Sequence, residues 1–159
     1  MNTITRESPD SVIDAVLSAS RVLVGVAARS LSDIAEEVTL TQYRTLVVLA
    51  SRGTQNLVGL AEAVGVTPAT ATRMCDRLVK KKLIVRASEP DDRRQVRLAL
   101  TKKGLGLVRA VTDRRRREIK TILSTITLKE QTALVQALSR FATAAGEVPE
   151  QDWSTGWVL

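Results

Sequence analysis

Apolar residues recur at three- and four-residue steps from Ile13 onward. This period predicts a long amphipathic helix that ends near residue 37. Ser8-Pro9-Asp10 indicates its start, because serine caps helices, proline suits the first helical position and an early carboxylate interacts well with the helix dipole. A second helix is predicted between a Thr41 cap and Gly53.

Two shorter helices are predicted next, each with its own start signal. Asn56 is suited to cap a helix over residues 57–64, which Gly65 ends. Thr67-Pro68 begins another helix with a capping hydroxyl and a proline at the first position. Apolar residues at helical spacing form its predicted inner face: Ala71, Met74, Cys75 and Leu78. The complementary positions face outward: Thr70, Thr72, Arg73, Asp76 and Arg77.

The spacing of the apolar residues then changes from the helical period to the two-residue period of a β-strand. Residues 83–87 form a short run rich in β-forming side chains, and apolar and other residues alternate over 96–100. The segment between them is polar and begins with Glu89-Pro90, which favours a turn. A β-hairpin with a long charged loop is therefore predicted.

Two long helices are predicted after the hairpin. Thr101 caps the first, which carries the apolar residues Leu105, Val108, Ile119, Ile122 and Leu123. Thr127 and Glu130 match a capping box, in which the hydroxyl and the carboxylate each satisfy an otherwise unpaired amide. They start a last helix that ends near residue 145 and carries Leu134, Leu138 and Phe141.

Three helices followed by a hairpin, over residues 41–100, is the order of a winged helix-turn-helix. The predicted fold class is therefore mostly α with a small β-hairpin, in a single domain over residues 1–159. The helices over 8–38 and 101–145 lie outside the winged module, and their apolar stripes need a partner. A second copy of the chain is the simplest partner, so we interpret them as dimerisation helices.

Residues 146–159 form a tail. Its Trp153 and Trp157 either cover an apolar seam on the partner subunit or lie loose in solution, and we favour the first because two exposed tryptophans would be a liability.

The charge distribution indicates a polyanionic partner. The chain has 24 Lys and Arg against 17 Asp and Glu, a formal net charge of +7. Nine basic and four acidic residues lie between Arg73 and Arg97, so most of the excess falls on the last helix and hairpin of the winged module.

The absence of histidine and the single cysteine, Cys75, exclude several classes of site. Neither a Ser-His-Asp or Cys-His nucleophile nor a Cys/His zinc site can be assembled, and an intrachain disulfide is excluded. We expect no enzyme activity, cofactor or metal. No run of 18 consecutive apolar residues occurs and the N-terminus lacks the apolar core of a signal peptide, so we expect no membrane segment and a cytoplasmic location.

The candidate DNA-binding residues lie on the helix after Thr67 and on the hairpin loop. Arginine can pair with guanine, a threonine methyl can contact the thymine methyl, and a helix N-terminus favours a phosphate oxygen. The major-groove candidates are Pro68, Ala69, Thr70, Thr72, Arg73 and Arg77. Arg93 and Arg94 suit the narrow, electronegative minor groove, and Asp92 is expected to hold a neighbouring arginine in position.

Each of these features also has a simpler interpretation. The helix after Thr67 could be an ordinary solvated amphipathic helix, and the loop a solvated turn. The run Arg114–Arg117 covers every face of a helix, which favours ion pairs with the tail or another helix over DNA contact. Cys75 lies on a predicted inner face, which favours core packing over a reactive thiol.

Residues 10–145 resemble the MarR (multiple antibiotic resistance regulator) family of bacterial winged-helix repressors. The most specific segment is 86–101, with Asp92 and Arg94 in the family's Asp-x-Arg wing signature followed by a strand and Leu-Thr. Residues 40–46, Leu60-Ala61 and 70–82 also fit the family pattern.

The resemblance implies a homodimer whose two winged modules read a pseudo-palindromic operator in double-stranded DNA. It implies that Thr70, Thr72, Arg73 and Arg77 read the groove, that Arg94 is the wing-tip arginine and that Asp92 braces it. Many members are released by phenolic or aromatic carboxylate ligands, and Thr72 and Arg86 match positions that can contact such a carboxylate. The family usually has glycine where this chain has Lys82, a residue that tolerates the expected left-handed cap poorly.

The resulting hypothesis is a dimeric, sequence-specific transcriptional regulator that represses adjacent genes and is relieved by a small aromatic or phenolic ligand. The alternative is a winged-helix protein–protein interaction module without a ligand response. The cysteine- and histidine-based sensing modes of the family are disfavoured by the composition.

Overall fold

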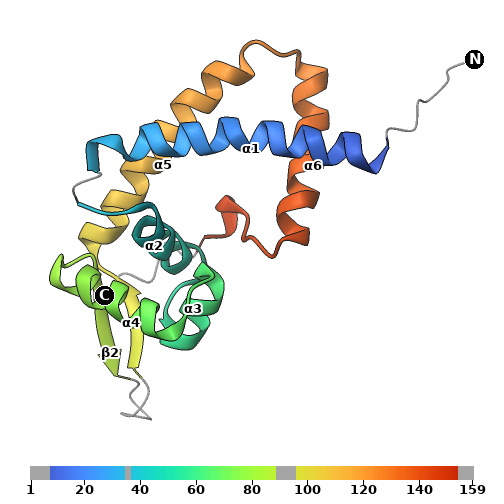
Figure 1. Cartoon of the computed structure of the whole chain (residues 1–159). Helices are drawn as coiled ribbons and strands as arrows, with labels where there is room; N and C mark the ends of the chain where they lie inside the picture. Colours follow the sequence, from blue (N-terminus) through green and yellow to red (C-terminus); the bar gives the residue numbers. More distant parts are fainter. Residues whose placement is uncertain (1–7, 35–36, 89–95, 154–159) are drawn as a thin grey trace, which may run out of the picture.

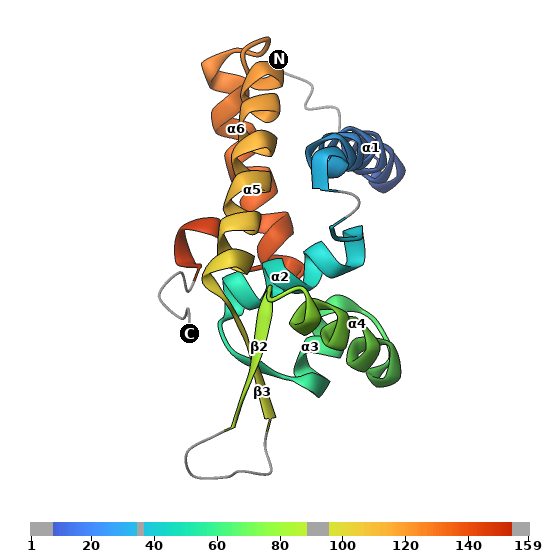
Figure 2. The same ribbon diagram turned by 90° about the vertical axis from the view of Figure 1, so that its left-hand side faces the viewer.

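The chain folds into a lobe of short helices beneath a frame of long helices. The computed structural model describes residues 8–34, 37–88 and 96–153. Helix α1 (Pro9–Leu31) crosses the frame that α5 (Lys102–Leu123) and α6 (Leu128–Ala144) form above the lobe, with α5 and α6 diverging from the turn that joins them (Figure 1). The view turned by 90° shows the hairpin strands extending downward from the lobe, away from the long helices (Figure 2).

The lobe contains α2 (Leu40–Arg52), α3 (Leu57–Val64) and α4 (Pro68–Lys80). Asn56 caps α3 and Gly65 ends it in the left-handed conformation, as predicted. The predicted Thr41 cap of α2 is wrong, because the helix is capped by Thr39. The Gln42 amide donates to the Thr39 hydroxyl and the Gln42 side chain accepts from the Thr39 amide, so this reciprocal box satisfies two amides at once.

The predicted hairpin is part of a three-stranded antiparallel sheet. Strand β2 (Ile84–Ser88) pairs with β3 (Val96–Leu100) in the register Ile84 to Leu100. The sheet order is β1-β3-β2, with the two-residue strand β1 (Gln55–Asn56) pairing on the other edge of β3. The sequence did not predict β1, because two residues are too short to show a strand period.

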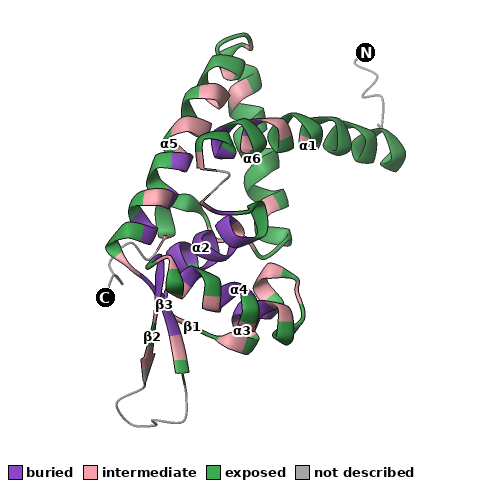
Figure 3. Cartoon of the chain, turned by 60° about the vertical axis from the view of Figure 1, so that its left-hand side comes forward, coloured by how far each residue is buried: buried purple, intermediate pink, exposed green. Residues whose placement is uncertain are grey.

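The apolar core belongs to the lobe and the start of α5 (Figure 3). Nine residues of α2 are buried, so this helix lies at the centre of the lobe. The largest fully buried side chains come from every element around it, and include Leu46, Leu60, Leu78, Leu83, Ile84 and Leu98. The predicted fold class, mostly α with a small sheet in a winged helix-turn-helix, is confirmed.

The long helices bury little of their apolar surface within one chain. Of α1 only Val26, Ser30 and Leu31 are buried, and no residue of α6 is buried. The apolar stripes of the long helices, which were expected to need a partner, are exposed here, with Leu17 51 % and Phe141 56 % accessible. Helix periodicity therefore marked these faces correctly as apolar, but the chain does not cover them itself.

Helix α1 is also unusually apolar along its length. Length and composition alone would let the run from Pro9 to Ile34 span a membrane, which the count of consecutive apolar residues had not indicated. Its most apolar window has a mean hydropathy of 1.6, and hardly any of that window is buried. A helix with these properties needs an apolar cover outside the single chain.

Ion pairs connect α5 with α1 and with the 3₁₀ turn η1 (Ser32–Ile34) that follows it. Arg114 pairs with Asp33 at 2.8 Å, and Arg29 pairs with Glu118. Arg116 pairs with Glu150 of the tail at 3.1 Å. The run Arg114–Arg117 was expected to form ion pairs with the tail or another helix, and this is confirmed for Arg114 and Arg116. Such exposed pairs contribute little free energy of folding, so they orient the helices more than they stabilise them.

Gly104 lets α5 approach the sheet closely. The backbone amide of Thr101 donates to the Leu83 carbonyl at 3.1 Å, which ties the start of α5 to the start of β2. A β-carbon at Gly104 would overlap that carbonyl oxygen, whereas a β-carbon at Gly106 meets nothing within 4 Å.

We predict opposite effects for alanine at these two glycines. Gly104→Ala forces α5 away from the sheet and should lower the free energy of unfolding by about 1–3 kcal/mol. Gly106→Ala should raise it by up to about 1 kcal/mol, because alanine favours a helix interior. Urea denaturation of both variants at one protein concentration checks this. Equal effects of the two substitutions would contradict the close packing of α5 on Leu83.

Candidate nucleic-acid interface

Helix α4 is anchored by one apolar face, as predicted. Ala71, Met74, Cys75 and Leu78 are all buried. The Thr67 hydroxyl caps the helix by accepting from the Thr70 amide at 3.2 Å. Pro68 occupies the first helical turn, where its missing amide hydrogen costs nothing. The burial of this face fixes which side chains of α4 meet the solvent.

The predicted DNA-binding residues of α4 lie on its outward side. Pro68, Ala69, Arg73 and Arg77 are exposed, while Thr70 and Thr72 are half-buried. The Thr70 hydroxyl accepts from the Thr67 hydroxyl at 3.0 Å and from the Arg73 guanidinium at 3.5 Å. These contacts hold Arg73 over the first turns of α4.

Thr72 has its hydroxyl engaged within the helix. It donates to the Pro68 carbonyl at 2.9 Å, so its methyl group is the part left for contact with a partner. An apolar contact to a thymine methyl needs this arrangement, since a free hydroxyl there would instead seek a hydrogen bond.

The predicted ligand contact Arg86 forms an ion pair between the hairpin and α4. Its guanidinium donates to the Asp76 carboxylate at 2.5 Å, with both side chains partly exposed. Thr72 stands one turn before Asp76, so Thr72 and Arg86 are on the same side of α4. The sequence did not predict this pair, which holds the hairpin against α4.

The predicted wing-tip residues Asp92, Arg93 and Arg94 lie outside the described residues. Strands β2 and β3 lead away from the long helices toward them (Figure 2). Their roles stay predictions.

A sequence profile of the MarR family matches residues 38–96. The HTH-type transcriptional repressor MdtR of Bacillus subtilis is 31 % identical over 119 residues, which cover 75 % of this chain and 77 % of MdtR. The crystal structure of RV1404 from Mycobacterium tuberculosis has a TM-score of 0.82 and 44 % identity, and the match covers 92 % of this chain and 99 % of RV1404. The chain belongs to the MarR family.

Two less similar structures share the fold. A Staphylococcus aureus MepR variant bound to an oligodeoxyribonucleotide has a TM-score of 0.60 and 23 % identity, and the match covers 87 % of this chain and 99 % of MepR. NadR in complex with 4-hydroxyphenylacetate has a TM-score of 0.64 and 23 % identity, over 89 % of this chain and 98 % of NadR.

The protein is a MarR-family transcriptional regulator with a winged-helix, DNA-binding fold. The family consists of transcriptional regulators, which confirms the expectation that this chain is not an enzyme.

The cap at the end of α4 is kept without glycine. Lys82 adopts a left-handed conformation with φ of 60°. Its amide donates to the Val79 carbonyl at 2.9 Å and the Leu83 amide donates to the Leu78 carbonyl at 3.0 Å, which is the Schellman arrangement. From the sequence this cap was expected to be unfavourable, because lysine tolerates the left-handed conformation poorly. Burial of Leu83 and of Leu78, whose carbonyl accepts from the Leu83 amide, holds the backbone there.

Cys75 is a packing residue of the same helix. It is fully buried, and burial raises the pKa of its thiol, while the Arg86 guanidinium acts in the lowering direction and the Asp76 carboxylate in the raising direction. A buried thiol with a raised pKa is a poor nucleophile, so the core-packing interpretation is confirmed.

Part of the tail is placed by the core of its own chain. Trp153 packs against this core and its indole nitrogen donates to the Val148 carbonyl at 3.3 Å, while the side chain stays half-buried. Its contact with the partner subunit stays a prediction. Trp157 lies outside the described residues.

We predict that Lys82→Gly stabilises the protein. Glycine relieves the left-handed strain of lysine and should raise the free energy of unfolding by about 1 kcal/mol. Lys80→Gly, at the last residue of α4, is the matched control and should lower it by about 0.5–1 kcal/mol. Urea denaturation at one protein concentration distinguishes them. A destabilised Lys82→Gly variant would show that the lysine side chain, not the backbone, holds the cap.

Proposed function

We propose that the protein is a homodimeric repressor that binds a pseudo-palindromic operator near the genes it controls and is relieved by a small aromatic or phenolic ligand. The observation that carries this proposal is the outward side of α4, where Arg73 and Arg77 are exposed and Thr70 positions Arg73. An exposed cationic helix beside a hairpin fits the major groove of double-stranded DNA.

The dimer is supported by the apolar surface that one chain leaves uncovered. Residues 8–38 and 101–145 are the proposed dimerisation helices, and 41–100 the proposed DNA-binding lobe. A second copy covers both α1 and α6 by the same symmetric contact. Arg21 in the middle of α1, and the ion pairs of α5 with α1 and with η1, favour a second copy over lipid as the cover and a cytoplasmic location.

Each DNA-binding residue has a distinct proposed role. Pro68 and Ala69 bring the N-terminus of α4 close to a phosphate, and Thr70, Thr72, Arg73 and Arg77 face the base edges. Arg93 and Arg94 enter the minor groove, with Asp92 as the brace of Arg94. MdtR, a named repressor, and the MepR complex with DNA support this assignment by similarity.

The proposed ligand response uses the junction between α4 and the hairpin. A ligand carboxylate can compete with Asp76 for the Arg86 guanidinium, and Thr72 lies on the same side of α4. Losing the Asp76 pair frees the hairpin to shift relative to α4, which changes the spacing of the two DNA contacts. The NadR complex with 4-hydroxyphenylacetate supports an aromatic carboxylate as the class of ligand.

Arginine substitutions should separate specific from general DNA binding. Arg73→Ala should relax the preference at one base position, at a cost of about 1–3 kcal/mol on the preferred site. Arg94→Ala should weaken binding to all sequences and make the salt dependence shallower. Arg117→Ala, on an exposed part of α5, is the matched control and should change neither.

The measurement is a salt titration of binding to operator and to random duplexes. If each subunit contacts about three or four phosphates, the log–log slope for the dimer should be about −6. A slope near zero, or equal effects of Arg73→Ala and Arg94→Ala on both duplexes, would refute the proposed interface.

The dimer should depend on the apolar face of α6. Leu138→Asp places a charge on that face in both subunits and should weaken dimerisation on the order of 100-fold or more, because burial of two leucines is lost at about 1.5–3 kcal/mol each. Gln136→Asp, on the opposite face, should leave the dimer intact. Sedimentation equilibrium measures both, with circular dichroism as a check on folding. A monomeric wild type, or a Leu138→Asp dimer of unchanged affinity, would overturn this interface.

A further inference from the structure

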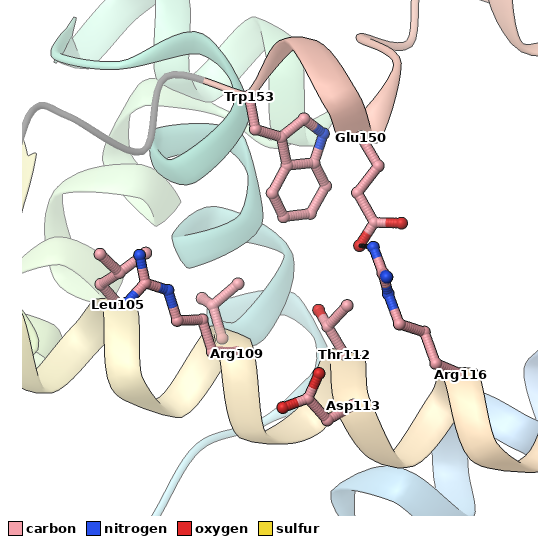
Figure 4. Close-up of a pocket in the computed structure, with 8 residues that line it drawn as sticks. Leu105, Arg109, Thr112, Asp113, Arg116, Glu150 and Trp153 are labelled. Carbon is pink, nitrogen blue, oxygen red and sulfur yellow. Dashed lines mark ion pairs between the residues drawn. The ribbon is translucent and has the colours of Figure 1, made fainter.

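A pocket of about 270 Å³ lies between α5 and the segment that follows α6. Its floor contains Leu105 and Val108 from the start of α5, which also belong to the core. Trp153 faces α5 across the pocket, and Glu150 and Arg116 close one end (Figure 4). Arg114 and Glu118, which pair with Asp33 of η1 and with Arg29 of α1, lie on another face of α5, so this pocket is separate from the contact between α1 and α5.

The upper wall of the pocket is a strap formed by residues 146–153, which is fastened to the lobe and to α5. Arg44 of α2 pairs with Glu147 at 2.7 Å, and Arg52 of α2 donates to the Gly146 carbonyl at 3.0 Å. Arg116 pairs with Glu150 at 3.1 Å. The 3₁₀ turn η2 (Glu150–Asp152) follows, and Trp153 directly after it packs against the core. The strap therefore has contacts at both ends and keeps the pocket wall in place.

The indole of Trp153 provides an aromatic wall. Its nitrogen is already bonded to the Val148 carbonyl, and the side chain is half-buried. With its one donor satisfied, the ring presents only its apolar face and edges to the pocket. An aromatic ring stacked against this wall and the aliphatic floor gains more than an aliphatic group of equal area.

Two opposite charges of the pocket lack partners within the described part of the chain. Arg116 and Glu150 neutralise each other. Arg109 and Asp113 both line the pocket, are exposed, and have no oppositely charged group of the described residues within 4 Å. They stand four residues apart, on successive turns of one helix face, with the Thr112 hydroxyl beside Asp113.

We infer that this pocket binds a small aromatic zwitterion of the α-amino acid class. The carboxylate of the ligand pairs with Arg109, its ammonium pairs with Asp113, and its ring lies between Trp153 and the aliphatic floor. A simple anion would meet the repulsion of Asp113 and a simple cation that of Arg109, so the charge pattern selects a molecule with both charges. The volume is just below the roughly 300 Å³ at which drug-sized sites begin, which suits a ligand with one or two rings.

An effect of this ligand on regulation would rest on the proposed repressor function. The strap connects the end of α6 to α2 in the lobe, so a ligand held beneath it stiffens the connection between the dimerisation helices and the DNA-binding lobe. The site itself does not depend on repression, and its test uses no DNA.

The test is calorimetric titration of the full-length protein with three probes that share one phenethyl frame. L-phenylalanine carries both charges, 3-phenylpropionate only the negative one and phenethylamine only the positive one. L-phenylalanine should bind with a Kd of about 1 mM or tighter, and at least about tenfold more tightly than either other probe. Equal binding of a singly charged probe, or no heat from any of the three, would overturn the inference.

Matched variants locate the binding. Arg109→Gln and Asp113→Asn should each weaken L-phenylalanine binding at least about tenfold, and Arg109→Gln should remove the advantage over phenethylamine. Arg117→Gln on α5 and Asp10→Asn on α1 remove the same charges outside the pocket and should leave the Kd unchanged.

The aromatic wall has its own pair of variants. Trp153→Leu should abolish measurable binding, whereas Trp157→Leu should not, and thermal melting confirms that both fold. Weakening by the control substitutions to the same degree as by the pocket substitutions would place the binding elsewhere. Because no DNA is present, failure of this titration leaves the proposed repressor activity intact, and failure of repressor activity leaves the titration interpretable.

Discussion

The burial of one face of α4 is the constraint on which the DNA-binding surface depends. Ala71, Met74, Cys75 and Leu78 pack into the core, and the helical period then places the arginines on the opposite side. Rotation of α4 by one residue would expose these apolar side chains and bury charge, at a cost far above the few kcal/mol that a domain can lose. The orientation of the cationic face is therefore a consequence of core packing.

The lobe and the long helices meet their apolar requirements in different ways. The lobe closes a core of its own around α2, whereas α1 and α6 leave large aliphatic and aromatic side chains exposed. Polar links join the two parts: Lys103 pairs with Glu37 at 2.9 Å, and Arg44 pairs with Glu147. Exposed ion pairs are weak, so the burial of the start of α5 in the core of the lobe does more than these pairs to set the position of the lobe relative to α5.

Local signals in the sequence predicted most element boundaries, because caps and glycines act within a few residues. The structure confirms four predicted helix caps, which are Asn56, Gly65, Thr67 and Thr127. The prediction failed at Thr41, where two hydroxyls compete and only the Thr39 pairing with Gln42 satisfies two amides. The strand β1 exists only because β3 offers it a hydrogen-bonding edge.

The sequence by itself determined the winged helix-turn-helix, the outward residues of α4 and the burial of Cys75, because periodicity and capping are local. Tertiary structure alone decided the pairing of Asp76 with Arg86, the seat of Trp153 on its own core, and the pocket beneath the strap. These features join residues far apart in the chain, and no local sequence pattern indicates which distant side chains will be in contact. The left-handed Lys82 belongs to the same group, since the packing around it outweighs the preference of the residue.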